Sequence, residues 1–92
     1  MRLLVTPTFA RAAKKLHPQQ KLELDIAVRT ISTDPTIGEL KVGDLVGVRV
    51  YKFRIMNQTC LLAYRVLDGD SLKLLTVGSH ENFYRDLKRS SE

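Results

Sequence analysis

The sequence predicts an α+β domain with a twisted antiparallel sheet, a helical hairpin near the N-terminus packed on one face of that sheet, and a short C-terminal helix. In two segments before residue 34, apolar residues recur at the spacing of one helix face. Between residues 48 and 77, apolar and polar residues alternate in segments separated by turn-forming residues, as in neighbouring antiparallel strands. The 92 residues contain no internal repeat, so we expect one domain spanning residues 1–92.

The first helix is predicted to follow a short strand at residues 1–6. Thr6 supplies a hydroxyl that can cap a helix, and Pro7 suits the first helical position. The dipeptide His17-Pro18 ends this helix, because proline disfavours a helical conformation in the residue before it. The apolar face is formed by Phe9, Ala12, Ala13 and Leu16.

A second helix is predicted after Pro18, and it ends at Ser32-Thr33-Asp34-Pro35. Two antiparallel helices joined by a tight turn leave an apolar stripe that needs a third surface to cover it. We expect the sheet to provide that surface. The apolar side of this helix consists of Leu24, Ala27, Val28 and Ile31.

Residues 36–47 combine three glycines with polar residues and predict an irregular loop with short turns. The loop lacks the spacing and the Lys-Ser/Thr ending of a phosphate-binding P-loop, so a nucleotide site is not expected. Three strands follow, at Val48–Ile55, Thr59–Leu67 and Ser71–Val77. Ser79 is a candidate cap for a final helix whose body is residues 82–87.

Positive charge is concentrated in the first two predicted strands. The chain has 15 Lys and Arg against 10 Asp and Glu, a net charge of +5. Residues 48–67 hold Arg49, Lys52, Arg54 and Arg65 with no acidic residue. This segment therefore carries most of the excess charge and favours an anionic partner.

Alternation along the first of these strands separates two kinds of side chain. Tyr51, Phe53 and Ile55 share the face that we expect under the helical hairpin. Lys52 and Arg54 then stand about 7 Å apart on the opposite, open face, a spacing suited to neighbouring phosphate oxygens. Arg65 of the next strand is a candidate to join this basic strip.

The composition narrows the class of protein. The single cysteine, Cys60, excludes an internal disulfide framework and, without neighbouring Cys or paired His, argues against a structural zinc site. No apolar run reaches the roughly 18 residues of a spanning helix, and the N-terminus lacks the features of a signal peptide. We expect a cytoplasmic protein with no membrane association, no metal and no cofactor.

Several segments resemble the RelE/ParE superfamily of bacterial toxins, the toxin halves of type II toxin-antitoxin pairs. They are Tyr51-Lys52-Phe53-Arg54-Ile55, Leu62-Ala63-Tyr64 and VGSHENFYR at residues 77–85. The opening strand, the Thr-Pro-Thr-Phe helix start and the helical hairpin also match the family's order of elements. The resemblance implies a RelE-like, microbial-RNase-like fold and an antitoxin partner that wraps the toxin. An acidic segment that folds on binding would suit the basic surface.

RelE-type members enter the ribosomal A site and cut mRNA, so the resemblance implies a metal-independent, ribosome-dependent endoribonuclease that inhibits translation. Lys52 and Arg54 match the family's basic positions on this strand and would hold the scissile phosphate. Tyr84 matches the family's C-terminal tyrosine, and His80 falls where many members have an arginine. Both would transfer protons or stack on a base. Candidates for RNA binding are Arg49, Arg65, Lys73 and Arg85, and DNA would be reached only through the antitoxin complex.

Two departures from the family pattern keep other functions open. Leu61 stands where nuclease members commonly have a phosphate-binding arginine, and Glu81 follows His80 where another basic residue is frequent. One alternative is a ParE-like protein that inhibits DNA gyrase through protein contacts and is no nuclease. The other is an inactive toxin that acts as a co-repressor with its antitoxin.

The candidate residues also have structural interpretations. Lys52 and Arg54 can form a solvated charged face. Tyr84 can be a packing aromatic of the last helix, and His80 can cap that helix. Both interpretations of each residue remain open on the sequence alone.

Overall fold

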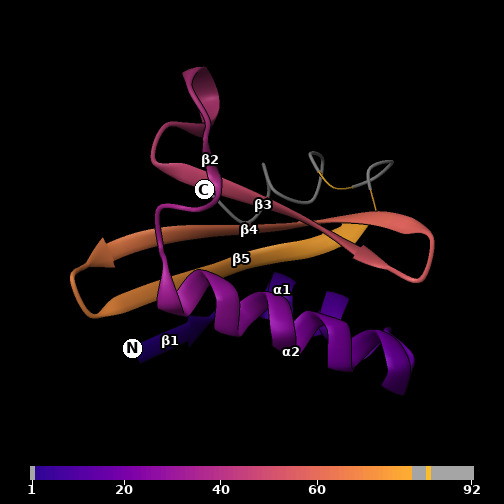
Figure 1. Cartoon of the computed structure of the whole chain (residues 1–92). Helices are drawn as coiled ribbons and strands as arrows, with labels where there is room; N and C mark the ends of the chain where they lie inside the picture. The colour runs from indigo at the N-terminus through magenta and orange to yellow at the C-terminus, as the bar shows by residue number, and fades with distance from the viewer. Residues whose placement is uncertain (1, 80–82, 84–92) are drawn as a thin grey trace.

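A computed structural model of the chain describes residues 2–79 and 83. Figure 1 shows the helices labelled α1 and α2 on one side of a sheet, which confirms the predicted α+β class and helical hairpin. The predicted C-terminal helix falls outside the described residues, except for Phe83. The elements are β1 (Arg2–Val5), α1 (Pro7–Lys14), α2 (Pro18–Thr33), β2 (Glu39–Leu40), a 3-10 turn η1 (Gly43–Leu45), β3 (Val48–Ile55), β4 (Gln58–Asp68) and β5 (Ser71–Ser79).

The five strands form one mixed sheet in the order β1-β5-β4-β3-β2. The antiparallel meander β3, β4 and β5 is present as predicted. The sheet is not antiparallel throughout, however, because β1 runs parallel to β5, with Arg2 opposite Ser71. Parallel neighbours need a long connection, and the helical hairpin and the meander together supply it.

The segment between α2 and β3 is more regular than an irregular loop. Glu39 and Leu40 pair with Val50 and Arg49, which makes β2 a two-residue edge strand. A strand this short has no periodicity, so the sequence gives no signal for it. In addition, β5 extends to Ser79, two residues beyond its predicted end.

The helices bury their apolar sides against the sheet. Tyr51 and Phe53 lie under the hairpin as predicted, and their rings stack with centroids 6.2 Å apart. Neither helix in the described part of the chain has the length and apolar character that a membrane crossing requires. The buried residues of this helix-side core are Phe9, Leu24, Ala27, Ile31, Leu62, Tyr64, Leu72, Leu74 and Val77.

A second core lies on the opposite face of the sheet. Phe83 packs there and is only 2% exposed. The sequence predicts an open face here, but Phe83 covers the central part of it. The buried residues of this second core are Val48, Val50, Leu61, Ala63, Leu75 and Phe83.

An irregularity in β5 shifts the alternation of its side chains between the two cores. Ala63 pairs with Thr76 and Tyr64 with Leu74, so Leu75 is an extra residue in β5. Such a bulge breaks the two-residue alternation. Leu74 faces the helix-side core and Leu75 the second core, as consecutive residues of a strand do, and the bulge returns Val77 to the side of Leu72 and Leu74.

Thr6 fixes the start of α1 at this bulge. Its hydroxyl lies 3.0 Å from the carbonyl oxygen of Leu74 and 2.9 Å from that of Leu75. The same oxygen accepts a hydrogen bond of 3.1 Å from the N–H of Phe9, which confirms Thr6 as the helix cap. One buried hydroxyl thus joins β1, α1 and β5.

Replacing this hydroxyl should destabilise the whole fold. For Thr6→Ala we expect a loss of about 1 to 3 kcal/mol in the free energy of unfolding, because the cap and the contacts to β5 are both removed. Thr6→Ser keeps the hydroxyl and should lose less than about 1 kcal/mol. Urea unfolding followed by circular dichroism measures both values. Equal losses in the two variants would show that the methyl group matters and the hydroxyl does not.

Candidate nucleic-acid interface

Lys52 and Arg54 are the exposed basic residues of β3, whereas Arg49, Arg65 and Lys73 are half-buried. Both side chains are exposed on β3, on the face away from the helices, where Arg54 lies opposite Thr59 and Lys52 opposite Leu61. Within residues 2–79 and 83, neither side chain makes a hydrogen bond or an ion pair. Two like charges without counter-charges create a local positive potential that attracts anions.

The strand that carries this pair is held firmly. The stacked rings of Tyr51 and Phe53 pack on the helix side, and Ile55 is only 2% exposed. The turn after Ile55 is tight, with Met56 at a φ of 58°. The basic pair therefore stands on a rigid support, which lowers the entropy cost of binding a ligand.

Arg65 and Lys73 lie on the same face but at its other end. They are cross-strand neighbours on β4 and β5, and Arg65 is also opposite Val48. Val48 precedes Lys52 by four positions, which corresponds to about 13 Å along a strand. The second core fills the space between, so the basic groups form two separate clusters, the Lys52–Arg54 pair and the Arg65–Lys73 pair.

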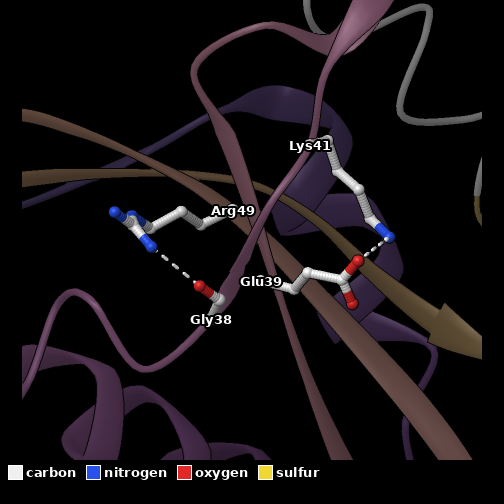
Figure 2. Close-up of polar contacts among 4 residues, drawn as sticks. All are labelled: Gly38, Glu39, Lys41 and Arg49. Carbon is white, nitrogen blue, oxygen red and sulfur yellow. Dashed lines mark hydrogen bonds and ion pairs between the residues drawn. The ribbon is translucent and has the colours of Figure 1, made fainter.

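Two arginines of the basic segment bind backbone carbonyls. A guanidinium N–H of Arg65 donates to the carbonyl oxygen of Val46 at 2.8 Å. Arg49 lies across from Tyr64 and donates to the carbonyl oxygens of Gly38 and Thr36 at 2.9 and 3.2 Å. Figure 2 shows the Arg49 contact beside the ion pair of Lys41 and Glu39, whose nitrogen and oxygen are 3.4 Å apart.

These contacts separate Arg49 from the other predicted RNA-binding residues. Arg49 projects from β3 on the opposite side from Lys52 and Arg54, and its contacts hold the segment that leads into β2. Its role in RNA binding stays a prediction. His80, Tyr84 and Arg85 lie outside the described residues, although Ser79 ends β5 directly before His80 and the buried Phe83 directly precedes Tyr84.

Tyr64 makes long-range structural contacts that the sequence did not predict. Its ring is fully buried, its hydroxyl donates to the carbonyl oxygen of Pro35 at 2.7 Å and it accepts from the N–H of Gly38 at 3.0 Å. A side chain at Gly38 would collide with the tyrosine, since a Cβ there would lie 2.6 Å from the hydroxyl oxygen. The glycine was visible in the sequence, but no local pattern links residues so far apart.

Burial also raises the pKa values of two side chains, Tyr64 and Cys60. Loss of hydration raises the pKa of Tyr64 above its ordinary value of 10.0, and the Gly38 hydrogen bond and the Arg49 charge oppose this only partly. Burial likewise raises the pKa of the Cys60 thiol, partly opposed by a hydrogen bond to the backbone of Ile55. A thiol that stays protonated is a poor nucleophile, which fits a packing role for Cys60.

The sequence matches the family described as ParE-like toxins of type II bacterial toxin-antitoxin systems over residues 3–88. The chain belongs to this family. The predicted resemblance to the RelE/ParE superfamily is therefore confirmed, and the protein is the toxin component of a type II toxin-antitoxin system. A comparison with curated proteins finds no match.

The fold is similar to that of solved RelE toxins. The toxin of the Escherichia coli RelBE complex has a TM-score of 0.71 and 20% identity, covering 87% of this chain and 96% of that one. A free mutant of E. coli RelE has a TM-score of 0.72 and 20% identity, covering 96% and 95%. The RelBE2 toxin-antitoxin complex of Mycobacterium tuberculosis has a TM-score of 0.73 and 22% identity, covering 86% and 96%. At these identities the likeness is one of fold.

The Tyr64 hydroxyl should give a measurable dependence of stability on pH. For Tyr64→Phe we expect a loss of about 1 to 3 kcal/mol at pH 7, because the Gly38 N–H and the Pro35 carbonyl lose their partner. Below pH 10 the phenol is protonated in both states. Above pH 10 the unfolded chain ionises first because the folded pKa is raised, so wild-type stability falls and the difference from Tyr64→Phe narrows.

Urea unfolding between pH 7 and pH 11 tests this expectation. Tyr51→Phe is the matched control, since its hydroxyl makes no hydrogen bond to any other described residue. Its stability should stay within about 0.5 kcal/mol of wild type. A constant difference between wild type and Tyr64→Phe across this range would contradict the proposed titration.

Proposed function

We propose that this toxin is a ribosome-dependent endoribonuclease that cleaves mRNA in the A site and thereby inhibits translation. The observation that carries the proposal is the Lys52–Arg54 pair, two exposed cations without described partners on a rigid strand. Lys52 lies opposite Leu61, and Leu61 lies opposite Gly78, one residue before the end of β5. His80 follows that end directly in the chain, which supports a shared site with the basic pair.

The chemistry requires no metal. A base takes the proton of the 2′-hydroxyl, the 2′-oxygen bonds to phosphorus, and the bond from phosphorus to the 5′-oxygen breaks as that oxygen receives a proton. The products are a 2′,3′-cyclic phosphate and a 5′-hydroxyl. Lys52 and Arg54 would hold the scissile phosphate and stabilise its developing negative charge. His80 and Tyr84 would supply the proton transfers or stack on an unpaired base.

A second contact to RNA would come from the Arg65–Lys73 pair. Its separation of about 13 Å from Lys52 along the strands matches a phosphate further along an extended single strand rather than the scissile one. Arg85 is a further candidate for RNA binding. Arg49 is left out of the proposed site, because its guanidinium holds Gly38 and Thr36 on the other side of β3.

An antitoxin is the proposed protein partner. The solved relatives include RelBE toxin-antitoxin complexes, and the net charge of +5 suits a partner rich in acidic residues. DNA would be contacted only through this complex. Action on translating ribosomes places the proposed activity in the cytoplasm.

The position of Leu61 favours a second candidate function. This side chain is 1% exposed and lies across from Lys52, where an arginine would complete a phosphate site. A ParE-like gyrase inhibitor that acts through protein contacts needs no such arginine. An inactive toxin that serves as co-repressor with its antitoxin is the remaining alternative.

Removal of the basic pair tests the nuclease proposal. On induction in a bacterial host, we expect Lys52→Ala/Arg54→Ala to relieve growth arrest and to reduce new 5′ ends in transcripts by about tenfold or more. The matched control, Arg11→Ala/Lys15→Ala, removes the same charge from exposed positions in and just after α1 and should retain both effects. Mapping of transcript ends measures the cleavage, and circular dichroism of the purified variants checks their folding.

The same experiment separates the alternatives. Growth arrest with a DNA-damage response and no new transcript ends would contradict the nuclease and support gyrase inhibition. Wild-type protein that arrests nothing at any expression level would support the co-repressor. Equal cleavage by wild type and the Lys52→Ala/Arg54→Ala variant would show that the active site lies elsewhere.

A further inference from the structure

The hairpin turn that joins β3 to β4 has a backbone conformation that its residues do not favour. Ile55 pairs with Gln58, so the turn consists of only two residues, Met56 and Asn57. Met56 has a φ of 58°, and it is the only residue other than glycine with a positive φ in the described part of the chain. A two-residue turn with a positive φ at its first position alone corresponds to type II′, which favours glycine at that position.

Packing does not compensate for this unfavourable conformation. In the left-handed region, the Cβ atom of any residue other than glycine lies too close to the following carbonyl oxygen. The side chain of Met56 is 77% exposed and belongs to neither core, so its burial adds no stability in return. Strained residues of this kind are concentrated at functional sites. The position therefore indicates that the exposed thioether contacts a ligand.

Met56 lies directly beside the basic pair. Arg54 precedes Met56 by two residues, which limits the separation of their Cα atoms to about 7 Å. Thr59 lies opposite Arg54 on β4, and it is exposed on the same face of the sheet as Lys52 and Arg54. A nucleotide whose phosphate is held by the basic pair would therefore have its base within reach of the hairpin tip.

The hairpin tip offers uncharged groups that suit a nucleobase. The thioether of methionine is polarizable and packs well against an aromatic ring. Asn57 and Gln58 are exposed, and their side-chain amides make no hydrogen bond to any other residue that the structure describes. Such amides can donate to and accept from the edges of an unpaired base. Lys52 and Arg54 provide contacts to phosphate, which carries no sequence information.

We propose that Met56 stacks on the base next to the scissile phosphate and that this hairpin tip discriminates between nucleotides at the cut. Met56 is then a specificity-determining residue, whereas Lys52 and Arg54 bind the phosphate of any nucleotide. Glycine would relieve the strained turn but has no side chain to stack on a base. The role at the cut rests on the proposed nuclease function, whereas the stacking itself does not.

The variant Met56→Gly separates the effect of this side chain on stability from its effect on RNA. Glycine adopts a positive φ without strain, so we expect the melting temperature to rise by about 4 °C. Val42→Gly is the matched control, because Val42 is 84% exposed but has a φ of −124°, which suits any residue. Its melting temperature should stay the same or fall. Thermal unfolding followed by circular dichroism measures both values.

Mapping of transcript ends after induction in a bacterial host tests the contact with the base. We expect Met56→Gly to reduce cleavage by about tenfold and to flatten the distribution of bases at the cut sites. Met56→Leu keeps an apolar side chain and should retain cleavage within about threefold. Val42→Gly should change neither the amount of cleavage nor the base distribution. Lys52→Ala/Arg54→Ala should reduce cleavage without altering the base distribution of the remaining cuts.

A binding experiment tests the stacking without cleavage and without the ribosome. One probe is a 2′-O-methyl adenosine trinucleotide, which cannot be cleaved because its 2′-oxygens are blocked. The other probe is the same sugar-phosphate backbone without bases. Titrations followed by NMR give the factor by which removal of the bases weakens binding. We expect this factor to be about tenfold larger for the wild-type toxin than for Met56→Gly.

Three results would overturn the inference. They are an unchanged base distribution at the cuts made by Met56→Gly, an equal effect of base removal on binding to wild type and Met56→Gly, and a lower melting temperature for Met56→Gly, which would show that the turn is not strained. A wild-type toxin that produces no new transcript ends would contradict the nuclease proposal. The binding experiment would then still decide whether Met56 stacks on a base, so the two proposals can fail separately.

Discussion

The buried hydroxyl of Thr6 at the bulge of β5 is the contact on which the rest of the structure depends. It ends β1, caps α1 and lies within hydrogen-bonding distance of the two carbonyl oxygens at the bulge. Consecutive residues of β5, Leu74 and Leu75, face opposite sides of the sheet, so one strand contributes to both cores. A small domain gains stability from a sheet buried on both sides, since a single-sided core would leave more apolar surface in water.

The second core also determines which basic side chains stay exposed on its face of the sheet. It occupies the middle of the face that carries Lys52, Arg54, Arg65 and Lys73, and so divides them into two pairs. Arg65 and Arg49 donate hydrogen bonds to backbone carbonyl oxygens. The Lys52–Arg54 pair is the part of the basic segment whose side chains are exposed and make no such contact with the described residues.

Much of the fold was predictable because its signals are local. Helical spacing in Phe9, Ala12, Ala13 and Leu16 and the capping residue Thr6 located α1. Alternation in β3 correctly assigned Tyr51 and Phe53 to the helix side and Lys52 and Arg54 to the other. The motifs that resemble RelE/ParE toxins identified the family. Each of these inferences uses residues within a few positions of one another, where backbone periodicity alone decides which side chains act together.

Contacts between distant residues were decided only by the tertiary structure. The sequence determined a basic segment at residues 48–67, but the fold turned Arg49 to one face and tied it to Gly38. The parallel pairing of β1 with β5, the bulge at Leu75 and the bonding of Tyr64 to Pro35 likewise join segments far apart in the chain. Composition and spacing do not show which residues of two distant segments lie opposite each other. This pairing register depends on how both cores are filled. The sequence by itself thus determined which residues of the strands are basic and on which face of a strand they lie, and the packing of two cores decided which of these side chains remain exposed.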